Sequence, residues 1–287
     1  MRHTILWSLA GAATLAVAGL GGHRLLSDRR SRAVEAELFA VTERLPTFSE
    51  ADLEGLPEPA RRWLRHAVTP GAPLAPACQL WMDGRMTPTP GGAPVDLSAV
   101  ETLAPRSGFV WTAHARMNGL PVRVRDYYHR GEGGVGVVAL GVVPIPLGGG
   151  PDVTRSSRGR LVAEGVWCPT ALLHPSVTWE AVDEHRARYT ITVDGEPIAV
   201  TIHVGLDGAL REVSLLRWGD VDGPPARLVP YGFRVEEEQT FDGVTIPSRL
   251  TGGWHYGTDA FDPAGAATFT VHRAALARPG GGLRSAR

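Results

Sequence analysis

The chain contains no lysine, and all 29 of its basic residues are arginine. This absence excludes a lysine Schiff base, a pyridoxal-phosphate linkage and the lysine of a P-loop. Only two cysteines are present, Cys78 and Cys168, which are too few for a disulfide framework. A single disulfide and two free thiols therefore both stay open. The formal net charge of −1 at pH 7 provides no overall field that would attract nucleic acid, so we expect no nucleic-acid partner.

Sequence motifs of metal and catalytic sites are also lacking. The ten histidines form no H-x-H, H-x-x-x-H or H-E-x-x-H pair, and we expect no metal. No G-x-S-x-G segment is present, which removes the usual nucleophile elbow. Residues 131–136 do match G-x-G-x-x-G, but the β-branched run after them predicts a strand rather than the helix that a dinucleotide site requires. We interpret this segment as a hairpin turn and expect no cofactor.

The first 23 residues contain the one long apolar run. Residues 4–20 (TILWSLAGAATLAVAGL) carry no charge, and about 20 such residues span a bilayer. A cleaved signal peptide with the small-x-small site Ala16-Val17-Ala18 is the alternative. Helix-forming sequence continues past that site without a turn signal, which favours an uncleaved single-pass anchor in the inner membrane. The positive-inside rule places the body in the cytoplasm, whereas short anchors of secreted-type domains often run the other way, so both sides stay open.

Four regions follow from the composition. We predict an anchor with a helical extension over residues 1–45, short helices and a linker over 46–76, a β domain over 77–276 and a disordered tail over 277–287. From Ala77 onward the hydrophobic period changes from 3.6 to 2, and turns such as Asp194-Gly195 and Asp242-Gly243 separate short apolar runs. This pattern predicts a meandering antiparallel sheet of about ten or more strands.

One helix interrupts the strands. The stretch Arg160–Trp179 (RLVAEGVWCPTALLHPSVTW) combines an apolar run with two tryptophans, and we predict an inserted helix over residues 154–173. A lone helix among antiparallel strands usually covers the concave face of the sheet, because each needs a place to bury its apolar side. The predicted fold is α+β: a large, strongly curved antiparallel sheet, an incomplete barrel, packed on a central helix and preceded by a transmembrane helix.

Two groups of residues are candidates for a site. Along the strand Pro121–His129, the side chains of Arg123, Arg125 and Tyr127 share one face and could bind an anionic head group, or simply face solvent. Glu164 is the one acid in the apolar part of the predicted helix. Burial would raise its pKa and suit it to acid–base chemistry, although Arg160 four residues earlier offers an ordinary partner.

Aromatic residues add a third group. Trp111, Trp167 and Trp179 supply bulky apolar surface, which forms either plain core or the lining of a cavity between helix and sheet. The binding residues that we predict are therefore Trp111, Arg123, Arg125, Tyr127, Glu164, Trp167 and Trp179.

Three segments resemble an uncharacterised bacterial domain family: LPEPARRWLRH from Leu56, GFVWTAHARMNGLPVRVRDYY from Gly108, and AEGVWCPTALL from Ala163. The family pattern is LPEPxRRYLRH, GFxWxAxxRxxxGLPVRxRDxY and AExxWxPTALL, and the match covers roughly Leu56 to Leu276. Cys168 stands where the family more often has an aromatic residue, so it is not a shared functional residue. The resemblance implies no established activity.

The hairpin EEEQTFDGVTIPSRL (236–250) is similar to the closing strands of the LolA and LolB lipoprotein carriers. That resemblance implies a curved, incomplete antiparallel barrel closed by helices, with an apolar cavity for acyl chains. No lipid-binding residue carries over position by position, and the chain lacks the lipobox of LolB.

Together, these patterns favour a membrane-anchored domain that binds a lipid or another hydrophobic or amphipathic ligand in a helix–sheet cavity. One alternative is an enzyme that uses Glu164, Arg125 and Tyr127 in acid–base chemistry on a hydrophobic substrate. The other is a scaffold for protein interaction. The sequence favours binding over catalysis, because no catalytic constellation is recognisable, and it leaves the oligomeric state open.

Overall fold

The computed structural model describes residues 26–88, 92–141 and 143–283. The predicted membrane span, residues 4–20, lies outside them. Within these ranges, no helix combines the length and the apolar character needed to cross a bilayer. The described part of the N-terminal helix runs from residue 26 to residue 39.

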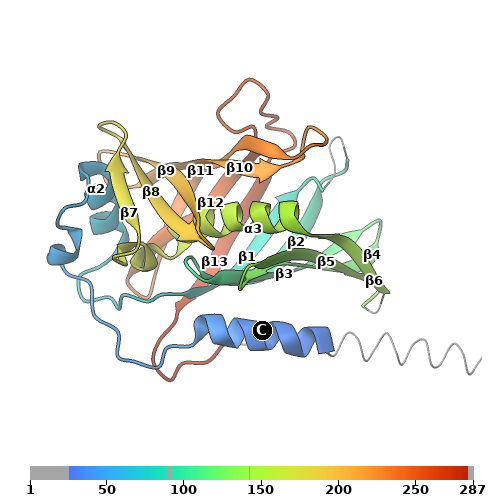
Figure 1. Ribbon diagram of the computed structural model, residues 1–287, viewed down its shortest axis with the longest axis horizontal. Coiled ribbons are helices and arrows are strands. Elements are labelled where there is room, and N and C mark those ends of the chain that lie inside the picture. The colour runs from blue at the N-terminus through green and yellow to red at the C-terminus, as the bar shows by residue number, and fades with distance from the viewer. Residues whose placement is uncertain (1–25, 89–91, 142, 284–287) are drawn as a thin grey trace, which may run out of the picture.

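A single antiparallel sheet of thirteen strands forms the body of the protein (Figure 1). Its order is β6-β5-β4-β3-β2-β1-β13-β12-β11-β10-β9-β8-β7, so every pair of adjacent strands is consecutive in sequence except β1 and β13. The sheet does not close, and β6 and β7 are its edges. The strands are β1 (Cys78–Met86), β2 (Val95–Ala104), β3 (Gly108–Met117), β4 (Leu120–His129), β5 (Glu132–Ala139), β6 (Val143–Gly149), β7 (Thr178–Ala181), β8 (Arg186–Val193), β9 (Glu196–Val204), β10 (Leu210–Gly219), β11 (Arg227–Phe241), β12 (Val244–Trp254) and β13 (Ala267–Leu276).

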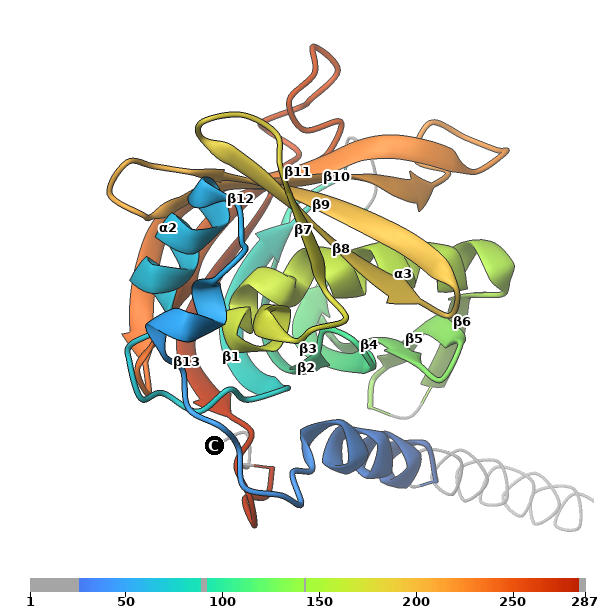
Figure 2. The same ribbon diagram turned by 60° about the vertical axis from the view of Figure 1, so that its left-hand side comes forward.

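The sheet curves around the helices that connect its two halves (Figures 1 and 2). The helix α3 (Pro151–Ala163) follows β6, and the 3-10 turns η2 (Glu164–Trp167) and η3 (Pro169–Leu173) continue it to β7. The turn η1 (Glu50–Leu53) and the helix α2 (Glu58–Ala67) cover the end of the concave face that α3 does not reach. The predicted α+β fold with a large, open antiparallel sheet is thus confirmed.

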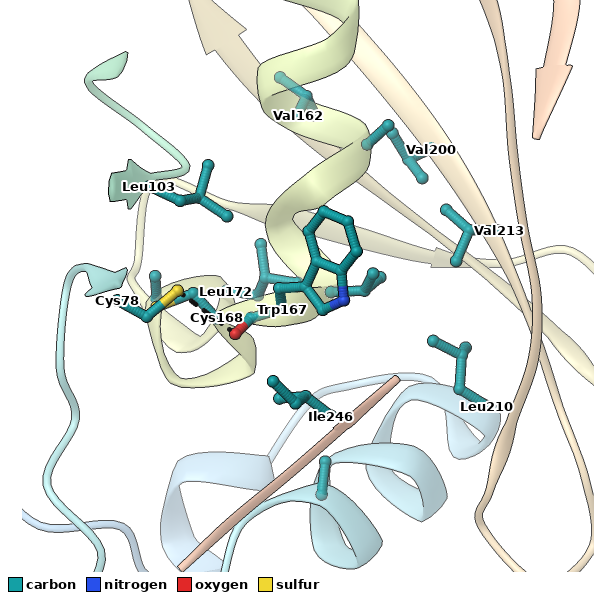
Figure 3. Packing of buried hydrophobic residues seen from close by; sticks show 14 of the residues in the cluster. Cys78, Leu103, Val162, Trp167, Cys168, Leu172, Val200, Leu210, Val213 and Ile246 are labelled. Carbon is teal, nitrogen blue, oxygen red and sulfur yellow. Dashed lines mark hydrogen bonds between the residues drawn. The ribbon is translucent and has the colours of Figure 1, made fainter. Parts of the chain in front are cut away.

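Strand alternation puts one row of side chains on the concave face. In β2, Leu97, Ala99 and Leu103 are buried there, and Ala99 and Leu103 lie opposite the buried Met82 and Cys78 of β1. Trp167 lies at the centre of this core, among Leu172, Ile246, Val200 and other apolar residues (Figure 3). The alternation therefore creates one main hydrophobic core between the helices and the sheet.

The outer face carries a smaller apolar cluster of its own. Leu38 and Phe39 of the N-terminal helix are buried against Val110 of β3 and Ala104 of β2. Ala277, the first residue of the predicted tail, is fully buried in the same cluster, and its N–H donates to the carbonyl of Ala77. The N-terminal helix thus packs on the opposite side of the sheet from α3.

The central helix differs from the predicted segment 154–173. It begins at Pro151, a residue that suits the first helical position because its missing N–H has no helical acceptor there. Regular α-helix ends at Ala163, and Cys168 has the non-helical angles φ −133° and ψ 62°. The ring of Pro169 disfavours the α conformation at Cys168, which explains why a regular helix does not continue through that residue.

The strand β6 forms from a segment whose prolines and glycines are typical of a connector rather than a strand. Its register pairs Pro144 with Val138 and Pro146 with Gly136. Proline cannot donate a ladder hydrogen bond and is therefore tolerated at the edge of a sheet. The edge position explains how a segment with two prolines still forms a strand.

Candidate functional site

The sheet separates the predicted site residues into two groups. Trp111 of β3 and Asp126 of β4 are register partners on the concave face, together with Glu164 of η2. Arg123, Arg125 and Tyr127 alternate with Asp126 along β4 and so face the outer side. Glu164 cannot act on one bound substrate together with Arg125 and Tyr127, because the sheet lies between them.

A cluster of charged residues surrounds Arg160 on the concave face. The guanidinium of Arg160 lies 2.6 Å from Asp126, 2.7 Å from Glu164 and 3.4 Å from Glu101 of β2. Its cationic carbon also lies 4.7 Å from the ring centre of Phe109 and 5.2 Å from that of Trp111. The local pairing of Glu164 with Arg160, expected from their spacing, is confirmed.

We call Glu101, Asp126 and Glu164 the acid cluster. Its three carboxyl groups surround the single guanidinium of Arg160. The side chain of Glu101 is fully buried, and burial together with the neighbouring Glu164 raises its pKa well above the usual range, although Arg160 opposes the shift. One carboxylate oxygen of each acid has no hydrogen-bond partner among the described residues. Burial and the neighbouring acid therefore favour the protonated form of Glu101 more than water would.

The sequence contained a signal for this cluster. In β2, Glu101 falls at an inward position between Ala99 and Leu103, and an acid on an apolar face needs a buried partner. That partner, Arg160, lies 59 residues further along the chain. Periodicity alone gives no information about which distant residue supplies the charge.

On the outer face, the arginines of β4 hold the N-terminal helix. The carboxylate of Asp28 lies 2.8 Å from Arg123 and 3.0 Å from Arg125, and Arg125 also donates to Ser27. Burial acts to raise the pKa of Asp28, but the two guanidinium groups outweigh it and lower that pKa below the usual range. Tyr127 packs against the apolar cluster of the same helix. The predicted anion-binding face therefore already holds one carboxylate.

A pocket of about 950 Å³ opens beside this contact, at the end of the sheet where the β3–β4 and β5–β6 hairpins turn. Its polar lining combines three arginines and a histidine with Asp83, Asp96 and hydroxyl groups, and its apolar lining includes Pro94, Val122 and Val138. The basic residues are Arg85, His114, Arg116 and Arg123. Arg85 pairs with Asp96, and Arg123 with Asp28. Among the described residues, no carboxylate lies within ion-pair distance of Arg116, which donates to the carbonyl of Gly119.

Trp167 and Trp179 do not line this pocket. The indole N–H of Trp167 donates to the carbonyl of Pro247 at 3.0 Å, and that of Trp179 to the carbonyl of Leu172 at 3.2 Å. The ring of Trp179 also lies 5.2 Å from that of Tyr189. Both side chains pack in or against the main core, and a cavity between helix and sheet stays a prediction.

The two cysteines are free thiols, both buried. A hydrogen bond with Cys168 and burial raise the pKa of the Cys78 thiol, which makes it a poor nucleophile. The described residues contain no group of three or more His, Cys, Asp or Glu side chains arranged to hold a metal ion.

Several solved structures are similar to this one at low identity. A LolA superfamily protein, NE2245, from Nitrosomonas europaea is 13% identical with a TM-score of 0.43, and the match covers 83% of this chain and 94% of that one. A DUF1329 family protein from Desulfovibrio piger is 11% identical with a TM-score of 0.33, over 70% of this chain and 86% of that one. NE2245 is described as a member of the LolA superfamily, the group that the hairpin sequence of residues 236–250 resembles.

No curated protein matches the sequence. The model of a family of unknown function, DUF6544, matches residues 46–265, which include both faces of the sheet and all of the helices after the N-terminal one.

Proposed function

Because the chain belongs to the DUF6544 family, whose function is unknown, we propose a function from its own structure. The protein is a membrane-anchored binding protein for an amphipathic molecule with an anionic head group. The ligand occupies the outer-face pocket beside the N-terminal helix. The observation that carries this proposal is the combination in that pocket of three arginines, a histidine and an apolar floor.

The volume and chemistry of the pocket suit such a ligand. Small-molecule sites in proteins commonly measure about 300–1,000 Å³ and combine apolar surface with a few convergent polar groups. Guanidinium groups match carboxylate and phosphate oxygens in geometry. Arg116, which has no carboxylate partner among the described residues, is the group best placed to bind the head group. Pro94 and Val138 then offer surface for the apolar part.

The position of the pocket supports the membrane anchoring in this proposal. Arg123 lines the pocket and also contacts Asp28, two residues after the first described residue of the N-terminal helix. The uncharged stretch of residues 4–20 lies before that helix in the sequence. An anchor formed by this stretch keeps the pocket within a short distance of lipid head groups, which are the most abundant anionic amphiphiles at such a surface.

The acid–base alternative is less well supported. Its strongest groups are Glu101, Glu164 and Arg160, but none of them lines the pocket. Arg160 neutralises part of the acid cluster and lies over Phe109 and Trp111, which is the arrangement of a buried structural ion network. We therefore favour ligand binding over catalysis.

Native mass spectrometry of the full chain, released from gentle detergent micelles, tests the proposal. The wild-type protein is expected to carry a lipid-sized adduct. Arg116→Glu should weaken binding at least about tenfold, because hydrogen bonds to charged groups contribute about 1.5–3 kcal/mol. Arg61→Glu on α2 is the matched control, since Arg61 is also exposed and does not line the pocket. An adduct that is absent from the wild type, or that both variants retain equally, would contradict the proposal.

A further inference from the structure

Five large apolar side chains are exposed at one end of the sheet. They belong to the tips of the β3–β4 and β5–β6 hairpins, where soluble proteins usually place polar turn residues. Their exposed fractions are 39% for Met117, 50% for Leu120, 55% for Leu140, 42% for Val143 and 42% for Ile145. We call these five residues the tip patch. Several large apolar groups exposed together mark an interaction surface.

The two hairpin tips form one continuous surface. The N–H of Leu140 donates to the carbonyl of Pro121 at 2.9 Å, which joins the second tip to the first. Register pairs extend the contact, with Ala139 opposite both Val122 and Val143. The tip patch is therefore a structural unit at the end of strands β3 to β6.

The tip patch lies on the side at which the described part of the N-terminal helix begins. In Figure 1, the starts of β4 and β6 lie on the side at which the described part of the N-terminal helix begins. Asp28 near that point is held by Arg123 and Arg125 of β4, so the start of the helix is fixed beside the same strands. Leu26, the first described residue, is itself 67% exposed.

The charges around the tip patch match a particular partner. Arg29 and Arg30, in the first turn of the described helix, are exposed, and Arg116 lies one residue before Met117. Exposed arginines next to exposed aliphatic groups suit a bilayer with anionic head groups, because each basic residue near such a surface adds attraction.

We propose that the tip patch inserts into the interfacial region of an anionic bilayer, the same membrane that holds residues 4–20. The hairpin tips then act as a second membrane contact that orients the body. This inference rests on the membrane anchoring proposed above and is independent of which ligand the pocket binds. Interfacial elements typically bury their apolar face about 5–10 Å deep, which hairpin tips can reach without unfolding the sheet.

The test uses the full chain reconstituted into phosphatidylglycerol-containing vesicles. A fluorophore is attached to Leu120→Cys or Leu140→Cys, and quenching by lipids that carry a nitroxide on the acyl chain is measured. Labelling is selective because Cys78 and Cys168 are buried. Leu206→Cys is the matched control, because Leu206 is 76% exposed and lies in the β9–β10 turn at the other end of the sheet. The neighbouring Gly205 accepts a hydrogen bond from Arg62 of α2, which fixes the position of this turn.

Severalfold stronger quenching at positions 120 and 140 than at position 206 is the expected result. Equal quenching at all three positions overturns the proposal. The double variant Leu120→Asp/Leu140→Asp should lower the quenching of a label at Val143, whereas Leu206→Asp/Leu228→Asp should not. Both pairs of leucines are at least half exposed, so the sheet is expected to fold with either pair of changes.

The two proposals fail in different ways. In one outcome, the tips are not quenched, but the wild type keeps a lipid adduct that Arg116→Glu weakens. That outcome would overturn only the insertion of the tip patch. Tips that are quenched while no adduct exists would overturn only the binding function of the pocket.

Discussion

At the scale of single residues, Glu101 sets a testable pH dependence. Its pKa in the folded state is raised by burial and by Glu164, above the ordinary value of 4.5. A carboxyl group with a raised folded-state pKa contributes stability that is fully present below its unfolded pKa and is lost as the pH rises through the folded value. We therefore expect wild-type stability to fall between pH 5 and pH 8 through this group. Glu101→Gln, which copies the protonated shape, should fall less over the same interval.

Thermal unfolding of the full chain in detergent micelles, followed by tryptophan fluorescence at the two pH values, measures this difference. Glu50→Gln is the control, because Glu50 is exposed and its hydrogen bond to Arg65 lowers its pKa. The contribution of Glu50 is present above its unfolded pKa and so does not change between pH 5 and pH 8. An equal loss of stability in wild type and Glu101→Gln would show that Glu101 is not the responsible group.

Arg160 is the other residue on which the acid cluster depends. Arg160→Met removes the one guanidinium that faces Glu101, Asp126 and Glu164. Breaking a buried pair from one side typically costs about 3–5 kcal/mol, since the remaining charges lose their partner. Arg65→Met removes an arginine from an exposed pair with Glu50 and should cost no more than about 1 kcal/mol. Urea unfolding of both variants measures the difference, and similar losses would mean that the Arg160 network is only a surface-like ion pair.

At the scale of elements, α3 depends on a glycine in β5. A β-carbon at Gly133 would lie 2.9 Å from the β-carbon of Ser157 and from the α-carbon of Thr154. Gly133→Ala should therefore push α3 off the sheet and cost about 1–3 kcal/mol, as overpacking usually does. Gly136→Ala on the same strand meets no atom within 4 Å and should be neutral or slightly stabilising. Thermal unfolding compares them, and equal midpoints would contradict this contact.

The contact between Gly133 and α3 also gives a structural reason for the second glycine of the G-x-G-x-x-G match. The sequence predicted a hairpin turn at this place, and Arg130 and Gly131 do form the β4–β5 turn with positive φ angles. The close approach of α3 to Gly133 could not be predicted, because it depends on a helix about 20 residues further along the chain. Local turn chemistry was visible in the sequence, but packing across elements was not.

For the strands and the central helix, too, the sequence indicated the local pattern but not every change of backbone conformation. Period-2 alternation predicted the large antiparallel sheet, because most of its strands have one buried face. The prolines of β6 interrupt that pattern and are typical of a loop. The helix prediction failed at its C-terminal half, where the apolar pattern of residues 164–173 persists but Pro169 prevents the α conformation. Hydrophobic pattern alone therefore did not reveal where the backbone conformation changes.

At the scale of the whole molecule, the candidate sites depend on distant segments. The alternation in β4 correctly put Arg123, Arg125 and Tyr127 on one face and Asp126 on the other. No local pattern indicated that Asp28, about 95 residues earlier, is the partner of those arginines, or that Arg160 joins β2 to β4. Such contacts arise only when the sheet curves and brings two faces against two different helices.

The N-terminal helix and the sheet should respond separately to a change in their contact. Asp28→Asn keeps the shape of the side chain but removes the charge that pairs with Arg123 and Arg125. Hydrogen exchange in residues 26–39 should become about tenfold faster, because bonds to charged groups contribute about 1.5–3 kcal/mol. Exchange in the sheet should not change, since the apolar cluster that holds this helix is separate from the main core.

Hydrogen-exchange mass spectrometry of the full chain in lipid nanodiscs measures both regions at once. Glu132→Gln is the control, because its contact with Arg30 is 4.0 Å long and both groups are exposed. If Asp28 fixes the orientation of the body on the bilayer, Asp28→Asn should also reduce the nitroxide-lipid quenching of a label at position 120, and Glu132→Gln should not. Faster exchange throughout the sheet would instead mean that the helix is part of one cooperative unit, in which case the body could not reorient about residue 28 without unfolding.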